Sequence, residues 1–362
     1  MDPLPQYSSH AFIPYLPTSS PLSPTSTRSS TSSTSSKIVE DIPLIDILPP
    51  VSLLNTSSWT YCGPLLQADA STLPSSFHTW AQSTIAGPIL PRLLPFLEFL
   101  QTFLSRAGAQ HYWLTIRATK PTTEYDTVRW HTDDIFFDPP GEKDRFGSSQ
   151  TQWTPNNKRR YWKLATTLLG PGTLFLKDGA SARRIQRAAK QKECSKRGEH
   201  TCSSFRCLGC LDAVEAVRHT LAEQFMHEEV ERPKYGDVAF FRLGDTEGAV
   251  HSEPACNIDR IFVNVVPGSE EELKSLMARW GLNYPRSWSF GVPVAFDNEA
   301  ISALPASSRV AAARRQDVDV VAESPSTMSL NMREEYTEWL RKKGFLFGQV
   351  FGSGKRDCSL AP

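Results

Sequence analysis

The 362-residue sequence predicts a mainly β protein with flanking helices, an α+β fold. Many short runs of β-branched and aromatic residues are separated by Gly and Pro turns, a pattern typical of a sandwich or a barrel. A stripe of Leu and Phe at helical spacing precedes these runs and predicts a helix packed on the sheet. Lys plus Arg and Asp plus Glu each number 39, and this balance argues against a general nucleic-acid or membrane-surface binder.

The chain before the predicted sheet divides into two parts. Residues 1–36 are rich in Ser, Thr and Pro and too poor in apolar side chains to offset the entropy of ordering, so we predict a disordered tail. Residues 37–110 are predicted to form a helical N-terminal extension, in which the pattern over 76–107 is helical. Its apolar residues between Leu90 and Leu104 recur three or four apart, and we interpret them as a buried face rather than as a partner site.

The predicted β domain covers residues 111–290. Its strand-like runs lie at 112–117, 127–131, 162–169, 174–176, 238–241 and 260–266. Residues 178–231 interrupt them with a charged, cysteine-bearing stretch, and apolar spacing over 211–230 predicts a helix there. We therefore expect a helical insertion between two strands. Residues 291–362 are predicted to be a linker followed by a short C-terminal helix.

Two histidines and one aspartate form a candidate metal site. His131 and Asp133 are two residues apart, and on an extended strand such residues face the same side. His251, which follows a second strand, would complete a set of two histidines and one carboxylate. This set leaves coordination positions open and suits non-haem Fe(II). Asp134 is the rival carboxylate, but it would point to the opposite face.

Arg260 opens the last predicted strand, nine residues after His251, and its guanidinium could grip a dicarboxylate through paired hydrogen bonds. The order of these motifs resembles the double-stranded β-helix, or jelly-roll, fold of the Fe(II)/2-oxoglutarate-dependent oxygenases. The Gly-Pro-Gly-Thr turn at 170–173, the Gly-Asp-Val-Ala lead-in at 236–239 and the Val-His-Ser-Glu-Pro string at 250–254 are similar to an uncharacterised branch of that superfamily. The resemblance covers about residues 110–268.

The resemblance implies a jelly-roll core with Fe(II) held by His131, Asp133 and His251. It further implies that 2-oxoglutarate chelates the iron, that Arg260 pairs with its far carboxylate, and that an unidentified substrate undergoes hydroxylation or a related C–H oxidation. Arg117 and Arg129 are the next candidates for the carboxylate anchor. Two alternatives remain open. One is a catalytically silent jelly-roll binding module with a zinc-stabilised interaction surface, and the other is a cupin-like metalloenzyme that does not use 2-oxoglutarate.

Four of the seven cysteines lie close together inside the predicted insertion. Cys194, Cys202, Cys207 and Cys210 could close one tetrahedral Zn²⁺ site, and unliganded thiols and redox chemistry are the alternatives. Basic residues crowd the start of the insertion, but no aromatic side chains interleave them, so a solvated helix face is favoured over nucleic-acid binding. We expect the cysteine cluster to be separable from the iron site.

The expected location is intracellular, either cytoplasmic or nuclear. The N-terminal region lacks a basic segment followed by an apolar one, and an odd number of cysteines argues against a disulfide framework. Its Ser-rich, acid-poor composition resembles a mitochondrial transit peptide, but Arg28 is its single arginine, so import is less favoured. No apolar run approaches the roughly 20 residues of a membrane-spanning helix.

Overall fold

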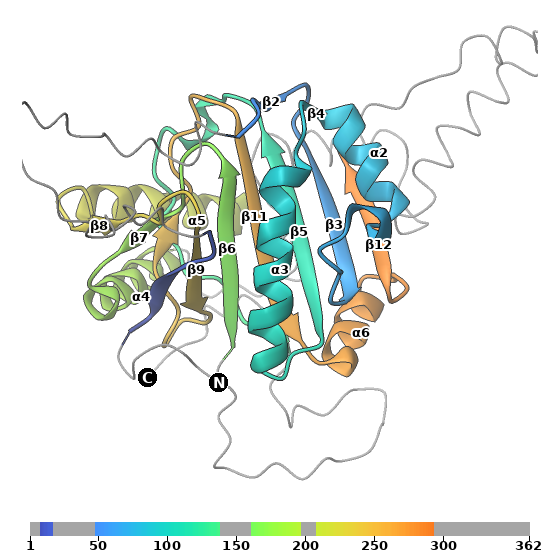
Figure 1. The fold of residues 1–362 in the computed structure, drawn as a ribbon. Helices are drawn as coiled ribbons and strands as arrows, with labels where there is room; N and C mark the ends of the chain where they lie inside the picture. Colours follow the sequence, from blue (N-terminus) through green and yellow to red (C-terminus); the bar gives the residue numbers. More distant parts are fainter. Residues whose placement is uncertain (1–7, 17–47, 138–160, 197–207, 293–362) are drawn as a thin grey trace, which may run out of the picture.

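The computed structural model describes residues 8–16, 48–137, 161–196 and 208–292 (Figure 1). Its largest unit is a seven-stranded antiparallel sheet. In spatial order the strands are β1 (His10–Pro14), β9 (Asp237–Arg242), β6 (Trp162–Leu169), β11 (Arg260–Gly268), β5 (His111–Thr119), β3 (Ser57–Pro64) and β12 (Arg286–Phe290). The strands that carry the central part of the sheet are distant in sequence, so its pairing is mostly non-local.

Two smaller sheets and five α-helices complete the described fold. The three-stranded sheet has the order β10 (His251–Ser252), β7 (Leu174–Leu176) and β8 (Val230–Glu231), and β2 (Ser52–Leu53) pairs with β4 (Ile85–Ala86). The α-helices are α2 (Ser75–Thr84), α3 (Leu90–Arg106), α4 (Gly179–Ser195), α5 (Leu208–Gln224) and α6 (Glu270–Arg279). Two short 3-10 turns are η1 (Ala70–Thr72) and η2 (Thr123–Tyr125).

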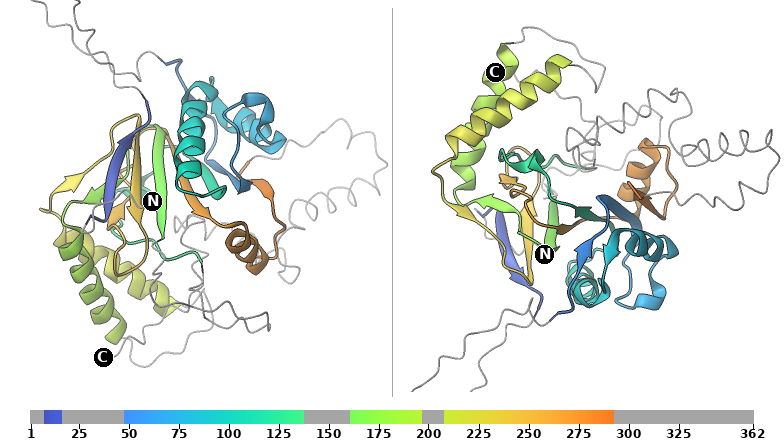
Figure 2. Two further views of the ribbon diagram at one scale, coloured as in Figure 1. Left: turned by 60° about the horizontal axis from the view of Figure 1, so that its bottom comes forward. Right: turned by 90° about the horizontal axis from the view of Figure 1, so that it is seen from above.

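Helix α3 covers one face of the large sheet (Figures 1 and 2). The predicted apolar stripe supplies its buried side chains, among them Leu93, Phe96, Leu97, Leu100 and Leu104. These residues pack against every second residue of the central strands, such as Leu114, Leu164, Phe240 and Val263. Because side chains alternate across a strand, the intervening residues face the other way, toward the three-stranded sheet.

That opposite face holds the candidate site. It carries Trp113 and Arg117 on β5, Lys163 on β6, Phe241 on β9 and Phe262 on β11. The apolar members of this set pack with Phe175 of β7 in a second buried cluster. The sheet therefore divides an apolar layer under α3 from a layer in which aromatic and charged side chains are mixed.

The predicted mainly β fold with flanking helices is confirmed. The runs expected at 162–169 and 174–176 are β6 and β7, and those at 112–117, 238–241 and 260–266 lie within β5, β9 and β11. The jelly-roll assignment and the division into domains stay predictions. Residues 178–231 contain α4, α5 and β8, and the neighbouring helices α4 and α5 lie beside the three-stranded sheet (Figure 1).

Three local predictions need correction. Residues 10–14, placed in the disordered tail, form β1, because pairing with the distant strand β9 supplies the order that local composition does not. The run at 127–131 forms no strand and makes one isolated bridge between His131 and His251. Residues 37–110 contain α2 and α3 but also β3, which is an integral strand of the large sheet.

Several predicted features lie outside the described residues. They are the remainder of the Ser/Thr/Pro-rich tail, most of the linker and the short C-terminal helix within 291–362. Among the helices of the described ranges, none combines the length and the apolar character that crossing a membrane requires.

Candidate metal site

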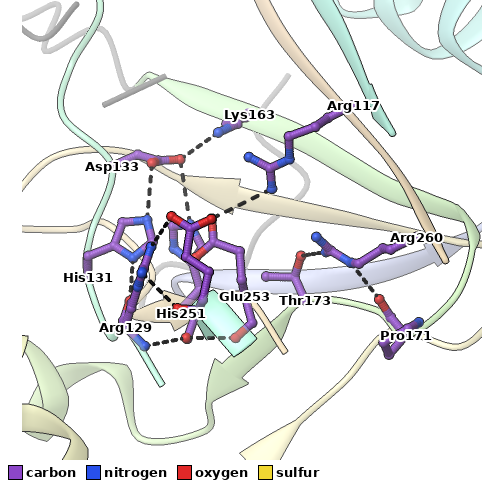
Figure 3. A network of polar contacts seen from close by, with 12 residues as sticks. Arg117, Arg129, His131, Asp133, Lys163, Pro171, Thr173, His251, Glu253 and Arg260 are labelled. Carbon is purple, nitrogen blue, oxygen red and sulfur yellow. Dashed lines mark hydrogen bonds and ion pairs between the residues drawn. The ribbon is translucent and has the colours of Figure 1, made fainter. Parts of the chain in front are cut away.

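The structure brings together the three residues that the sequence selected as metal ligands. One ligand atom from each of His131, Asp133 and His251 lies within 4.8 Å of the other two. The Nε2 atoms of His131 and His251 are each 3.7 Å from an oxygen of the Asp133 carboxylate (Figure 3). Since metal–ligand bonds are about 2 Å long, three donors at this separation can surround one ion. The rival Asp134 is exposed, whereas Asp133 is buried.

Backbone hydrogen bonds set the positions of these ligands. His131 and His251 exchange two hydrogen bonds, each N–H donating to the other's carbonyl oxygen at 2.9 Å, and their ring centroids are 4.4 Å apart. The carbonyl oxygen of Asp133 accepts from Gly244 N at 2.8 Å. The bridge thus fixes the backbone at His131, although residues 127–131 form no strand. His131 and Asp133 still bring their ligand atoms within 4.8 Å of each other.

Both histidines present the same ring nitrogen to the site. His131 Nδ1 is 2.7 Å from the carbonyl oxygen of Arg129, and His251 Nδ1 is 3.0 Å from that of Ala249. A carbonyl only accepts hydrogen bonds, so each Nδ1 is the donor, and in the neutral ring Nε2 then has a free lone pair. Metal-binding histidines are commonly oriented in this way by a partner on the other nitrogen.

The charge states of the site also suit a cation. Burial, followed by the nearby His131, lowers the pKa of His251 to about 4, so its ring is neutral near pH 7. Burial alone would raise the pKa of Asp133, but the Lys163 ammonium and the two histidines lower it well below its ordinary value. A neutral imidazole and an ionised carboxylate are the forms that coordinate metals.

A small cavity of about 40 Å³ adjoins the three ligands and opens to solvent. Besides them it is lined by Arg117, Lys163, Thr173, Phe241, Glu253, Phe262 and Asn264. Lys163 Nζ lies 2.8 Å from Asp133 Oδ2, and Arg117 Nη2 lies 3.7 Å from Glu253 Oε1 (Figure 3). Neither Lys163 nor Glu253 was predicted from the sequence to belong to the site. Glu253 stands two residues after His251, so the spacing that selected Asp133 could have selected it too.

Arg260, the predicted carboxylate anchor, lies directly behind this cavity. Its side chain donates from Nε to the carbonyl oxygen of Pro171 at 2.9 Å and from Nη2 to Thr173 Oγ1 at 3.4 Å. Thr173 lines the cavity, and Arg260 does not. The guanidinium groups of Arg117 and Arg260 lie 5.2 and 4.7 Å from the centroid of the Phe262 ring. Burial, and then the charge of Arg117, lowers the pKa of Arg260 to about 10.

Arg129 was the remaining candidate for the anchor. Its guanidinium contacts Glu124 in two places. Nη2 donates to the Glu124 carbonyl oxygen at 2.7 Å, and Nη1 lies 3.6 Å from the Glu124 carboxylate. Its guanidinium also lies over the Tyr125 ring, 5.1 Å from the centroid. Arg129 is not among the residues that line the cavity.

The predicted zinc ligands are not described as a group. Cys202 and Cys207 lie outside the described residues. Cys194 lies in α4 and Cys210 in α5, but their side chains are outside the description as well. The zinc site therefore stays a prediction.

Comparisons with known proteins add little to this geometry. No family model matches the sequence, and no curated protein matches it. Among solved structures, the chain is similar to a truncated viral collagen prolyl hydroxylase from Paramecium bursaria Chlorella virus-1. The identity is 13%, the match covers 49% of this chain and 68% of that one, and the TM-score is 0.23. A similarity of this size does not by itself indicate a shared activity.

Proposed function

We propose that this chain is an Fe(II)- and 2-oxoglutarate-dependent oxygenase. The observation that carries the proposal is the convergence of His131, Asp133 and His251, whose ligand atoms all lie within 4.8 Å of one another. Two imidazoles and one carboxylate on one side of a metal leave positions open, which is the arrangement of non-haem Fe(II) oxygenases. The donor set therefore fits iron, and thiolates, which would favour zinc, are missing from this set.

The charge around the cavity supports a doubly negative cosubstrate. Three basic side chains and two carboxylates lie in or directly behind it, namely Lys163, Arg117, Arg260, Asp133 and Glu253. A divalent metal would add two positive charges, so a dianion such as 2-oxoglutarate would be strongly attracted. We place its far carboxylate between Arg117 and Thr173, with Arg260 holding Thr173 from behind.

The bound iron would supply the activation of O₂ and the oxidation of a substrate C–H bond. The residues of this chain would bind the metal, orient the reacting groups and shield them from water. Lys163, 2.8 Å from Oδ2 of Asp133, would hold this carboxylate in place and keep it ionised for the metal. Phe241 and Phe262 place apolar rings on the cavity wall, where they would exclude water from the reacting groups.

The proposal is tested by metal binding and by turnover of the cosubstrate. Anaerobically purified full-length protein should bind about one Fe(II) per site and should release succinate from 2-oxoglutarate in the presence of O₂. His251→Ala should abolish Fe(II) binding and succinate release. His78→Ala, a change at an exposed histidine outside the cavity, should leave both activities unchanged. Succinate release that persists in His251→Ala would rule out this site.

A cupin-like metalloenzyme that does not use 2-oxoglutarate is the second candidate. The observation that favours it is the carboxylate of Glu253, which already faces Arg117 inside the cavity. A cosubstrate would have to compete with Glu253 for that guanidinium. Calorimetric titration of Mn²⁺-loaded protein with 2-oxoglutarate separates the two functions, because only the oxygenase should show saturable binding.

A further inference from the structure

Helix α4, which opens the cysteine-bearing insertion, contacts the loop that carries two of the candidate ligands. Gln186 on its buried face donates from Nε2 to Thr132 Oγ1 at 3.1 Å. Thr132 is the residue between His131 and Asp133, and both Thr132 and Gln186 are buried, at 8% and 3% exposure. A hydrogen bond in such surroundings fixes the loop more firmly than one at the surface.

The same helix also holds the segment that leads to His251. Three of its basic residues donate to this segment: Arg187 to the Asp245 carbonyl oxygen at 3.1 Å, Lys190 to Asp245 Oδ1 at 2.7 Å, and Arg183 to the Gly248 carbonyl oxygen at 3.0 Å. Thr132 closes the network by donating to the same Oδ1 of Asp245 at 3.3 Å. Because Lys190 and Asp245 are about half exposed, the buried contact of Gln186 carries most of the constraint.

We propose that α4 is a positioning element of the metal site and that Gln186 is its principal positioning residue. Through Thr132 it fixes the spacing of His131 and Asp133, and through Asp245 the same network reaches the segment before His251. The insertion is therefore part of the site that holds the metal, which reverses the separability expected from the sequence. This inference rests on the metal site proposed above, but it does not depend on the cosubstrate or on the reaction.

The test measures the affinity of the histidine site of the full-length protein for Co²⁺ without any turnover. The visible absorption of this site lacks the intense charge-transfer bands that Co²⁺ shows when it is bound by cysteine thiolates. Gln186→Leu should raise the Kd for Co²⁺ about tenfold, the lower end of what the loss of a partner behind metal ligands costs. If Gln186 acts through Thr132, Gln186→Leu should add little in a Thr132→Val background, because two residues of one contact are not additive. Additive effects would overturn the proposal.

The matched control is Arg184→Gln, an exposed change on the same helix, where Arg184 donates to Ser181 Oγ of α4 itself. It should leave the Kd unchanged. Should Gln186→Leu fail to fold, Thr132→Ser and Thr132→Val provide the same test, because serine keeps the hydroxyl group and valine removes it. Wild-type protein that does not bind Co²⁺ would refute the proposed metal site. Wild-type binding that is equalled by Gln186→Leu would refute only the role of α4.

Discussion

The ammonium nitrogen of Lys163 lies 2.8 Å from Oδ2 of Asp133, and both side chains are more than nine-tenths buried. The pair joins the large sheet to the loop that carries the candidate ligands, since Lys163 belongs to β6. A buried charge that loses its partner is costly, so each member depends on the other. A bound metal would make Asp133 less dependent on Lys163, because it offers the carboxylate a second cation.

Lys163→Met should therefore destabilise the metal-free protein by about 3–5 kcal/mol, the usual cost of leaving a buried charge without its partner. Saturating divalent metal should restore much of that loss, because the ion takes over the neutralisation of Asp133. Thermal unfolding with and without Mn²⁺ measures both effects. Lys177→Met, which breaks an exposed pair with Glu229, should be neutral. Equal stabilisation of wild type and Lys163→Met by metal would contradict this role.

The two arginines beside Phe262 should differ in their effect on 2-oxoglutarate binding. Arg117→Met should weaken binding about 10- to 100-fold, since it removes a charge-assisted hydrogen bond inside the cavity. Arg260→Met should weaken it less, because Arg260 acts through Thr173. Calorimetry on Mn²⁺-loaded protein gives both values, with the exposed Arg106→Met as the control. A larger loss in Arg260→Met would identify Arg260 as the direct anchor.

His10 should make the protein sensitive to mild acid. Burial lowers its pKa in the folded state, although the nearby Glu231, 3.0 Å away, acts in the opposite direction. The unfolded chain, with an ordinary histidine pKa of about 6.5, then binds more protons below that pH, so stability falls as the pH falls. His10→Phe should lose less stability than wild type between about pH 7 and about pH 5 in chemical unfolding. If the free energy of unfolding falls equally with pH in wild type and in His10→Phe, this role of His10 is contradicted.

The packing of α3 on the large sheet predicts a large effect of truncating Phe96. Its side chain has no exposed surface, and Phe96→Ala should lower the free energy of unfolding by about 3–5 kcal/mol. Glu98→Ala, an exposed change on the same helix, should alter it little. Urea unfolding checks both variants. A small loss in Phe96→Ala would mean that α3 is not an integral part of the core.

The cysteine cluster is predicted to bind about one Zn²⁺ per chain, because four thiolates close a single tetrahedral site. Cys207→Ser combined with Cys210→Ser should remove that zinc, as measured by elemental analysis of the purified protein. Because Cys194 lies in α4, loss of zinc should also weaken Co²⁺ binding at the histidine site if α4 positions that site. Zinc that persists in the double variant would show that these thiols are not ligands.

The elements that were predicted best from the sequence are those whose pattern of residues lies within one short segment. The buried runs that became β6 and β7 have the composition of strands along their whole length, and the stripe on α3 repeats within a single helix. The metal triad was predicted because His131 and Asp133 are neighbours and because motif order selected His251. Each of these inferences needed only residues close together in the chain or a simple order of motifs.

What could not be predicted depends on distant contacts. The order of β1 comes from pairing with β9, and the backbone position of His131 is set by its bridge to His251. In the sequence, Lys163 was interpreted only as one residue of a strand. It belongs to the site because the folded chain brings it within 2.8 Å of Asp133. Arg260 was correctly placed at the start of a strand, but its distance from the cavity wall depends on Pro171 and Thr173.

The position of β1 at the border of the large sheet has a practical consequence. It covers the hydrogen-bonding edge of β9, residue by residue from His10 against Phe241 to Pro14 against Asp237. A recombinant form that begins after the low-complexity stretch, near residue 37, would lack this strand and leave one edge of β9 unpaired, while the other edge stays paired with β6. Such an open edge can recruit strands from other molecules, so we expect the shortened protein to aggregate. Retaining residues 8–16 on the polypeptide would protect against that self-association.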